Sequence, residues 1–202
     1  VEPFLEMIEK VWVDTYTAEV GQQTLRSYIP KQILLVGSAS YNDDGSTTEG
    51  TAEGGRQIVL YSVNDFNFEL EQIQSYAHVM HHEFAHILHQ NVEYDAEFEK
   101  ITPSYSSSWM QMNDETARSK GFSTAYASSS ADEDFAEMVS IMLTNSPEDW
   151  DNMIENAGNA AAVEALRKKE AIVVAYMKNN WGVNMKDFQK EVVAAIEAAV
   201  RN

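Results

Sequence analysis

Cysteine is absent from the chain, so disulfide bonds, thiolate metal ligands and cysteine nucleophiles are all excluded. A transition-metal site must therefore be built from His, Asp and Glu. Basic residues are also scarce, since 14 Lys and Arg stand against 32 Asp and Glu, a formal net charge of −18. Such a charge repels nucleic acid and anionic membrane surfaces, so we expect no nucleic-acid partner.

Long apolar runs are missing as well. No stretch of 18 apolar residues occurs, and we therefore expect no membrane-spanning segment. The sequence begins at Val1 rather than Met, without a signal-like segment. We expect that an upstream segment, which could have been a secretion signal, has been removed.

The apolar pattern predicts one α+β unit over residues 1–202, with 44% hydrophobic residues to form its core. Apolar residues recur at helical spacing in several segments, and two short β-favouring runs lie between the first and second of them. Predicted helices cover residues 2–16, about 69–88, about 131–144, a stretch opening at Pro147, 159–178 and 184–200, and predicted strands cover 33–36 and 58–61. Residues 41–55 and 92–108 are predicted to be loops, the first of them mobile.

A short motif on the second long helix carries the chemistry. His82-Glu83-Phe84-Ala85-His86 matches H-E-x-x-H, and it lies on a segment that is predicted to be helical on other grounds. Four residues bring the second His to about 40° from the first and roughly 6 Å along the axis, so both imidazoles can bind one zinc ion. Glu83 points about 100° away, which suits a general base beside the metal.

A catalytic zinc needs a third protein ligand. His89 shares the helix face but lies about 10 Å above His82 along the axis, so a role beside a ligand or facing the substrate is favoured over ligation. Glu133 and Glu137 share one face of a later helix, where one could bind zinc while the other orients a ligand imidazole. An ordinary acidic helix N-terminus is the alternative for this pair.

The segment from His82 to Gln90, HEFAHILHQ, resembles the substrate import-associated zinc metallohydrolase lipoproteins, a zinc-binding metallopeptidase family. The region around Tyr105 and Trp109 and the later acidic helix are similar too, so the resemblance covers about residues 60 to 145. It implies a zincin-like fold with a small sheet, a long H-E-x-x-H helix and a helical C-terminal part. It also implies one zinc ion, association with an outer-membrane nutrient importer, and a lipid anchor, export and cell-surface location for a longer precursor.

A more distant resemblance concerns the mechanism. The segment from Tyr126 to Glu137, YASSSADEDFAE, is similar to the stretch of the anthrax lethal factor protease domain in which a tyrosine precedes a zinc-ligand glutamate by seven residues. This resemblance implies that Glu133 is the third ligand, that Glu137 lies just outside the ligand shell, and that Tyr126 stabilises a developing oxyanion. The pattern is that of a gluzincin.

The sequence therefore predicts a zinc-dependent hydrolase that cleaves peptide bonds, with Glu83 as the general base. Residues 58–61 could form an edge strand that pairs with an extended peptide, or an ordinary sheet strand. Two alternatives remain: a binding module of a nutrient importer in which zinc is structural or vestigial, and a hydrolase of non-peptide amides. Retention of Glu83 argues against the first, because a structural zinc site needs no base.

Overall fold

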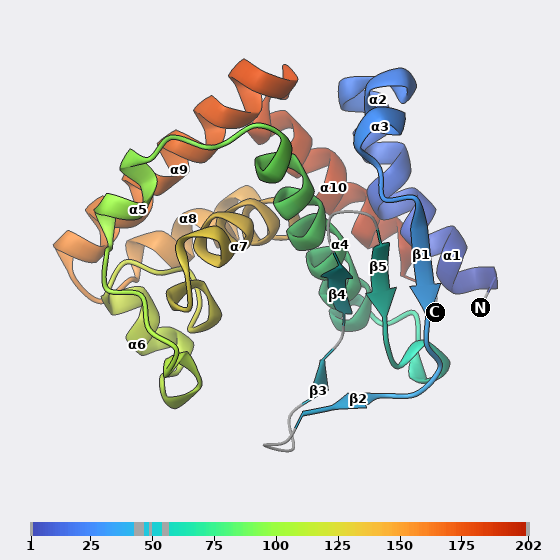
Figure 1. Cartoon of the computed structure of the whole chain (residues 1–202), viewed down its shortest axis with the longest axis horizontal. Helices are drawn as coiled ribbons and strands as arrows, with labels where there is room; N and C mark the ends of the chain where they lie inside the picture. Colours follow the sequence, from blue (N-terminus) through green and yellow to red (C-terminus); the bar gives the residue numbers. More distant parts are fainter. Residues whose placement is uncertain (1, 43–46, 49, 54–56, 201–202) are drawn as a thin grey trace.

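The fold is mostly helical and contains one small mixed sheet (Figure 1). The structure is a computed structural model, and it describes residues 2–42, 47–48, 50–53 and 57–200. The helices are α1 (Glu2–Ile8), α2 (Thr15–Val20), α3 (Gln22–Tyr28), α4 (Leu70–Asn91), α5 (Glu97–Ile101), α6 (Asp114–Ser119), α7 (Ala131–Thr144), α8 (Pro147–Glu155), α9 (Ala160–Trp181) and α10 (Met185–Ala199). A π-helical segment, Glu9–Asp14, joins α1 to α2, and 3-10 turns occupy Val63–Asp65, Trp109–Gln111 and Tyr126–Ser128. The strands are β1 (Gln32–Leu35), β2 (Ser40–Tyr41), β3 (Thr47–Thr48), β4 (Gly50–Glu53) and β5 (Gln57–Leu60).

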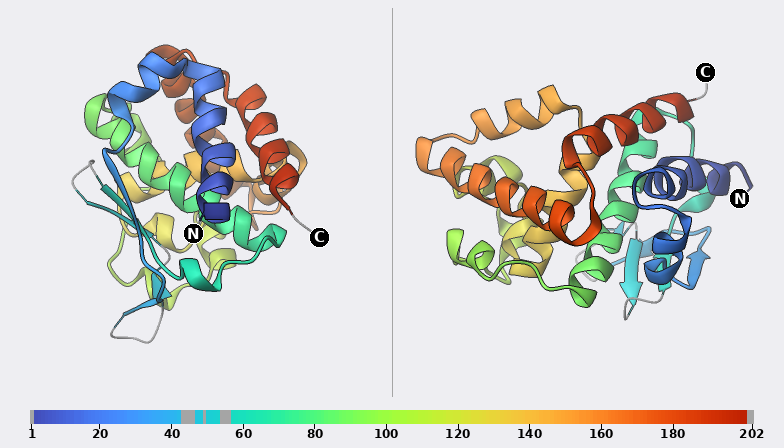
Figure 2. Two further views of the ribbon diagram at one scale, coloured as in Figure 1. Left: turned by 90° about the vertical axis from the view of Figure 1, so that its right-hand side faces the viewer. Right: turned by 90° about the horizontal axis from the view of Figure 1, so that it is seen from above.

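Helix α4 runs through the middle of the molecule. The sheet and α1–α3 lie on one side of it, and α5–α9 lie on the other, as the views in Figures 1 and 2 agree. Its apolar residues are buried against both sides, among them Ile73, Met80 and Phe84, none more than 2% exposed. The predicted long helix is thus confirmed, with the H-E-x-x-H segment in its second half.

The predicted C-terminal helices are confirmed as α8, α9 and α10. Ser146 caps α8 by accepting a hydrogen bond from the backbone N–H of Asp149, and Asn159 caps α9 in the same way through Ala162. Gly182 ends α9 with a left-handed conformation, φ 74°. The prediction for residues 92–108 was wrong in part, because the short helix α5 lies inside the expected loop.

The order of strands decides between the two alternatives for residues 58–61. The three-stranded sheet has the order β1-β5-β4, with β1 parallel and β4 antiparallel to β5. Residues 58–61 are therefore central rather than an edge strand. The strand at the sheet edge next to β5 is β4, which lies inside the predicted mobile loop of residues 41–55. That loop also contains β2 and β3, while residues 43–46, 49 and 54–56 lie outside the described residues.

Gly50 explains how β4 fits against the long helix. A Cβ atom at this position would collide with the Val79 side chain of α4, so only glycine lets the strand approach so closely. Polar residues and glycines dominate this segment, and a sequence pattern of that kind is typical of loops. Backbone pairing with β5, which the pattern does not encode, makes it a strand.

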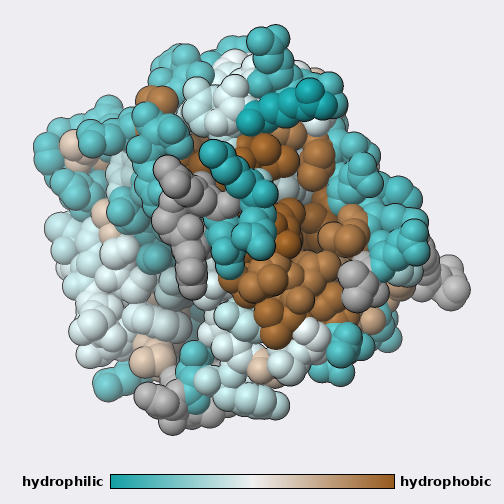
Figure 3. Space-filling model, turned by 45° about the vertical axis from the view of Figure 1, so that its right-hand side comes forward, coloured by the Kyte–Doolittle hydropathy of each residue, from teal (hydrophilic) through white to brown (hydrophobic). Residues whose placement is uncertain are grey.

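Apolar surface gathers on the sheet side of the molecule, as Figure 3 shows. Leu34 of β1 contributes to the exposed apolar area with 42% of its side chain accessible. Strand β1 is the outer strand of the sheet on the side away from β4. Among the described residues, every helix is too short or too polar to span a lipid bilayer.

A buried ion pair joins α7 to α9. Lys169 and Asp134 form a salt bridge, and both side chains are completely buried. The Lys169 ammonium also donates to the backbone oxygen of Gly121 at 2.8 Å and lies 4.3 Å from the centre of the Phe122 ring. Tyr105 donates to the same Asp134 oxygen as Lys169. The C-terminal helices are thereby linked to the segment that leads to the 3-10 turn at Tyr126–Ser128.

His81 packs in the core. Its ring lies 5.5 Å from that of Tyr16 and 6.2 Å from that of Phe188, centre to centre, and it is fully buried. Burial lowers the pKa of His81 to about 3, because a charged imidazole is poorly solvated there.

We expect this histidine to make the zinc-free protein sensitive to acid. Between pH 6.5 and 3 the unfolded chain binds a proton at His81 that the folded chain does not, so the stability that is present above pH 6.5 falls as pH falls. Between pH 7 and pH 5, His81 should lower the free energy of unfolding by about 2 kcal/mol. Urea unfolding of the wild type and of His81→Phe at both pH values would measure it. Equal pH slopes for the two proteins would contradict the prediction.

Candidate metal centre

Two imidazoles of α4 face the same point. His82 and His86 are one helical turn apart, and their Nε2 atoms lie 3.1 Å from each other. His82 is buried, with 5% of its surface exposed. The regular helix through this segment produces the arrangement, since a spacing of four residues returns the side chain to nearly the same face.

Glu133 approaches these imidazoles from a second helix. Ser130 caps α7 by accepting a hydrogen bond from the backbone N–H of Glu133, which fixes the first turn of the helix. The Glu133 Oε2 atom then lies 3.0 Å from His82 Nε2 and 3.2 Å from His86 Nε2. The structure thus brings together the three residues that the resemblance implies as ligands, although 47 residues separate Glu133 from His86.

The three donor atoms fit a zinc ion. Their mutual distances of 3.0, 3.1 and 3.2 Å are close to the roughly 3.3 Å that separates ligands of a tetrahedral zinc with bonds of about 2.0–2.1 Å. Two imidazoles and one carboxylate are also a donor set found in catalytic zinc sites, which keep one position open. A group of His82, His86 and Glu133 can therefore hold one metal ion.

A polar cavity of about 530 Å³ opens beside this group. All three candidate ligands line it, together with Glu83, Tyr126 and the strand residues Thr48 and Thr51. The cavity lies between α4, the start of α7 and strands β3 and β4. Glu83 and Tyr126, the candidates for the base and the oxyanion donor, thus share one cavity with the metal ligands.

The carboxylates and imidazoles of the site shift each other's pKa values. Burial lowers the pKa of His82, but its contacts with Glu133 and Glu137 outweigh burial and raise the pKa to about 10 in the zinc-free protein. Contacts with His82 and His86 hold the pKa of Glu133 below its usual range despite burial. Burial and the nearby Glu133 charge raise the pKa of Tyr126, so its hydroxyl keeps its proton and can donate a hydrogen bond.

Each candidate imidazole ligand has a partner at its other ring nitrogen. His82 Nδ1 lies 2.9 Å from Glu137 Oε1, and His86 Nδ1 lies 2.9 Å from His89 Nε2. Contacts of this kind orient a metal-binding imidazole and select its tautomer. The structure therefore places Glu137 behind the candidate ligands, as the resemblance implies, and His89 there too, as the helix geometry favours.

Sequence reasoning missed further residues around the site. Trp109 packs edge-on against Tyr126, with ring centres 4.9 Å apart, and His78 lies 3.0 Å from Glu137 through its Nε2 atom. The four-residue spacing of His78 from His82 places both on one helix face and could have indicated this contact. Nothing in the sequence pattern points to the packing of Trp109, because it depends on the fold of the loop before α7.

We expect Glu133→Ala to weaken zinc binding by more than about 100-fold, and His89→Ala by only about tenfold, the range for a residue that orients a ligand. The reason is that the Glu133 Oε2 atom lies beside the Nε2 atoms of both imidazoles, where it can bind the same ion. His89 contacts only the Nδ1 atom of His86, on the side of the ring away from that ion. Competition with a chromophoric chelator would measure both affinities. The reverse ranking would make His89 a ligand and would exclude the proposed ligand set.

Comparisons with known proteins agree with a metal centre. Residues 1–186 match the family described as "putative zinc-binding metallo-peptidase". A crystal structure of a "putative zinc-binding metallo-peptidase" from Bacteroides caccae is similar, with 33% sequence identity and a TM-score of 0.85 over 98% of this chain and 76% of that chain. No curated protein matches the chain. From its fold and from the match over most of its length, the chain belongs to the zinc-binding metallo-peptidase family.

Proposed function

We propose that this protein is a gluzincin-type peptidase that binds one zinc ion through His82, His86 and Glu133. The observation that carries the proposal is the meeting of three donor atoms from two helices in a cavity that Glu83 and Tyr126 also line. Zinc bound there would supply Lewis-acid chemistry, polarising a carbonyl and lowering the pKa of a water molecule. Side chains of the protein would carry out the proton transfers and stabilise the oxyanion.

Glu83 is the general base in this proposal. Its carboxylate follows His82 on α4 and faces the cavity, so it can take a proton from the attacking water and later give it to the leaving nitrogen. Tyr126 lines the same cavity with a protonated hydroxyl. That hydroxyl can donate to the carbonyl oxygen as negative charge develops on it.

The strand β4 supports a peptide as the substrate. In the described part of the chain β4 pairs with β5 on one side only, and Thr51 of β4 lines the cavity. An edge strand with unpaired backbone groups can add an extended peptide by hydrogen bonding. A peptide in this position would pass between β4 and the H-E-x-x-H segment of α4.

Incubation with a diverse peptide mixture would test the proposal. Zinc-loaded protein should generate new peptide ends that mass spectrometry detects, and a chelator should suppress them. If products are absent although zinc is bound at one equivalent, the protein is not a peptidase, and the alternative of a non-catalytic binding module of a nutrient importer gains support. Hydrolysis of non-peptide amides by the same sample would point to the other alternative.

The biological setting in this proposal rests on the HEFAHILHQ segment. Its resemblance to importer-associated lipoproteins supports an exported protein that acts on a peptide or protein substrate near an outer-membrane nutrient importer. Labelling of intact cells with a reagent that does not cross membranes would test the location.

A further inference from the structure

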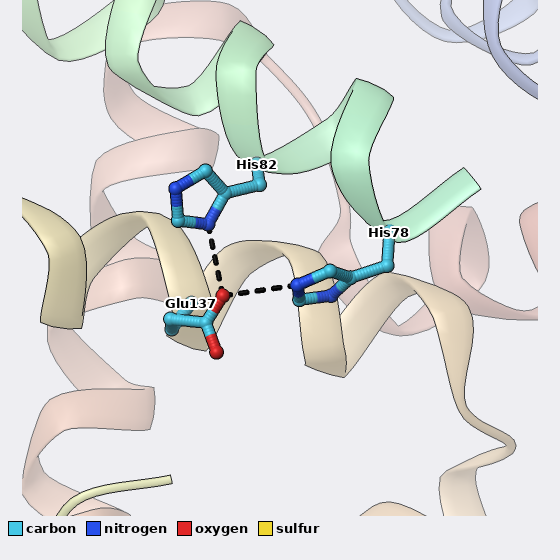
Figure 4. Close-up of side chains that lie close together, drawn as sticks. All are labelled: His78, His82 and Glu137. Atoms are coloured by element: carbon cyan, nitrogen blue, oxygen red, sulfur yellow. Dashed lines mark ion pairs between the residues drawn. The ribbon is translucent and has the colours of Figure 1, made fainter. Parts of the chain in front are cut away.

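Glu137 occupies a central position behind the metal centre. It lies one turn after Glu133 on α7 and is 3% exposed. Its Oε1 atom lies 2.9 Å from His82 Nδ1 and 3.0 Å from His78 Nε2, and Figure 4 shows both rings directed at this one oxygen. Two rings of α4 therefore share one carboxylate oxygen of α7.

The other oxygen of Glu137 reaches a different segment. Thr124 donates a hydrogen bond from its hydroxyl to Glu137 Oε2 at 2.7 Å. The same hydroxyl oxygen accepts a hydrogen bond from the backbone N–H of Ala127 at 3.1 Å. Ala127 follows Tyr126 within the 3-10 turn Tyr126–Ser128. One carboxylate thus contacts a candidate metal ligand on one side and fixes the turn that carries Tyr126 on the other.

A second metal ion could in principle use His78, His82 and Glu137, since their donor atoms are also close together. Two observations argue for a direct ionic contact of both rings with Glu137 instead. His82 directs its Nε2 atom toward Glu133 and the cavity, and Glu137 already has Thr124 on its second oxygen. Neither His78 nor Glu137 lines the cavity, whereas His82, His86 and Glu133 all do.

We infer that Glu137 fixes the position of the metal ligand His82 relative to the turn that carries Tyr126. His78 and Thr124 are positioning residues that act through Glu137. His78 fixes the oxygen that faces His82. Thr124 transmits the position of Glu137 to the turn. The inference rests on the proposed function for zinc binding by His82 and for the role of Tyr126 in catalysis.

Thr124→Val tests the link to the turn, because valine keeps the shape and removes the hydroxyl. Backbone amides of residues 125–129 should exchange with solvent about fivefold faster, as expected when one buried hydrogen bond is lost. The kcat for peptide hydrolysis should fall about tenfold with KM roughly unchanged. Thr124→Ser should restore both quantities. Thr144→Val is the matched control, since the buried Thr144 hydroxyl bonds only to the Ser140 carbonyl of its own helix.

His78→Phe tests the other branch, with His78→Gln as the variant that can restore a donor. Zinc loss to a chelator should be about tenfold faster in His78→Phe, while amide exchange at residues 125–129 stays unchanged. Unchanged zinc loss, or unchanged exchange in Thr124→Val, would overturn the inference. Two zinc equivalents in the wild type and one in His78→Phe would also overturn it, in favour of a second metal site. Zinc loss and amide exchange do not require peptidase activity, so a wild type that cleaves no peptide would refute the proposed function separately.

Discussion

Glu83→Gln should lower peptide hydrolysis by about 100-fold or more while the protein keeps its zinc. The amide preserves the shape of the side chain but cannot accept the proton of the attacking water, and general-base catalysis typically contributes 10²- to 10⁴-fold, on the order of 3 to 5 kcal/mol. The metal should remain because Glu83 is not among the residues whose donor atoms converge. Steady-state kinetics on any peptide that the wild type cleaves, together with zinc analysis of the same samples, would measure both effects.

Glu71→Gln provides the matched control for this variant. Glu71 lies in the first turn of the same helix, is exposed and is absent from the cavity lining. Its replacement should leave kcat and zinc content unchanged. Full activity of Glu83→Gln would show that another group takes the proton, and loss of zinc in this variant would show that Glu83 contributes to metal binding.

Tyr126→Phe should lower kcat by about 10²- to 10³-fold with a much smaller change in KM. The hydroxyl would donate to an oxygen whose negative charge develops only in the transition state, so its loss affects the transition state more than substrate binding. The ring should stay in place, because Trp109 packs edge-on against it and it lies 5.9 Å from the His82 ring, centre to centre.

Zinc content and the unfolding transition should both survive Tyr126→Phe. Tyr41→Phe is a suitable control, because Tyr41 is 77% exposed. Removal of its hydroxyl should leave kcat, zinc content and the unfolding transition unchanged. Unchanged turnover of Tyr126→Phe at full zinc occupancy would make Tyr126 a packing residue. The seven-residue spacing between Tyr126 and Glu133 would then be without catalytic meaning.

The helical part of the fold could be predicted from the sequence because its information is local. The apolar residues of α4 recur at a period that only a helix satisfies. Pro147, in the first turn of α8, and Asn159, the N-cap of α9, mark helix starts. Strand β4 could not be predicted, since it forms by pairing with β5 and lies so close to Val79, 29 positions further along the chain, that only glycine fits at position 50. Short elements such as α5 are too brief for periodicity to be recognised.

The candidate site shows the same division between local and distant information. His82, Glu83 and His86 follow from one helical turn, so their spacing predicts their arrangement. Glu133 could be proposed only because a catalytic zinc needs a third ligand and because the surrounding segment resembles a known protease. Thr124 gave no signal, since a single threonine in a loop has no pattern. Only the folded chain brings its hydroxyl to Glu137.

The ion pair between Lys169 and Asp134 constrains any attempt to shorten this protein. A fragment that ends before α9 would lose both Lys169 and the helix that packs on α7 beside Asp134, the neighbour of Glu133. In the intact fold, removal of one partner of such a buried pair typically costs about 3–5 kcal/mol. A helix without catalytic side chains thus supports the helix that carries the third candidate ligand. A minimal enzyme built from residues before α9 would require an apolar replacement at Asp134 in the same step as the truncation.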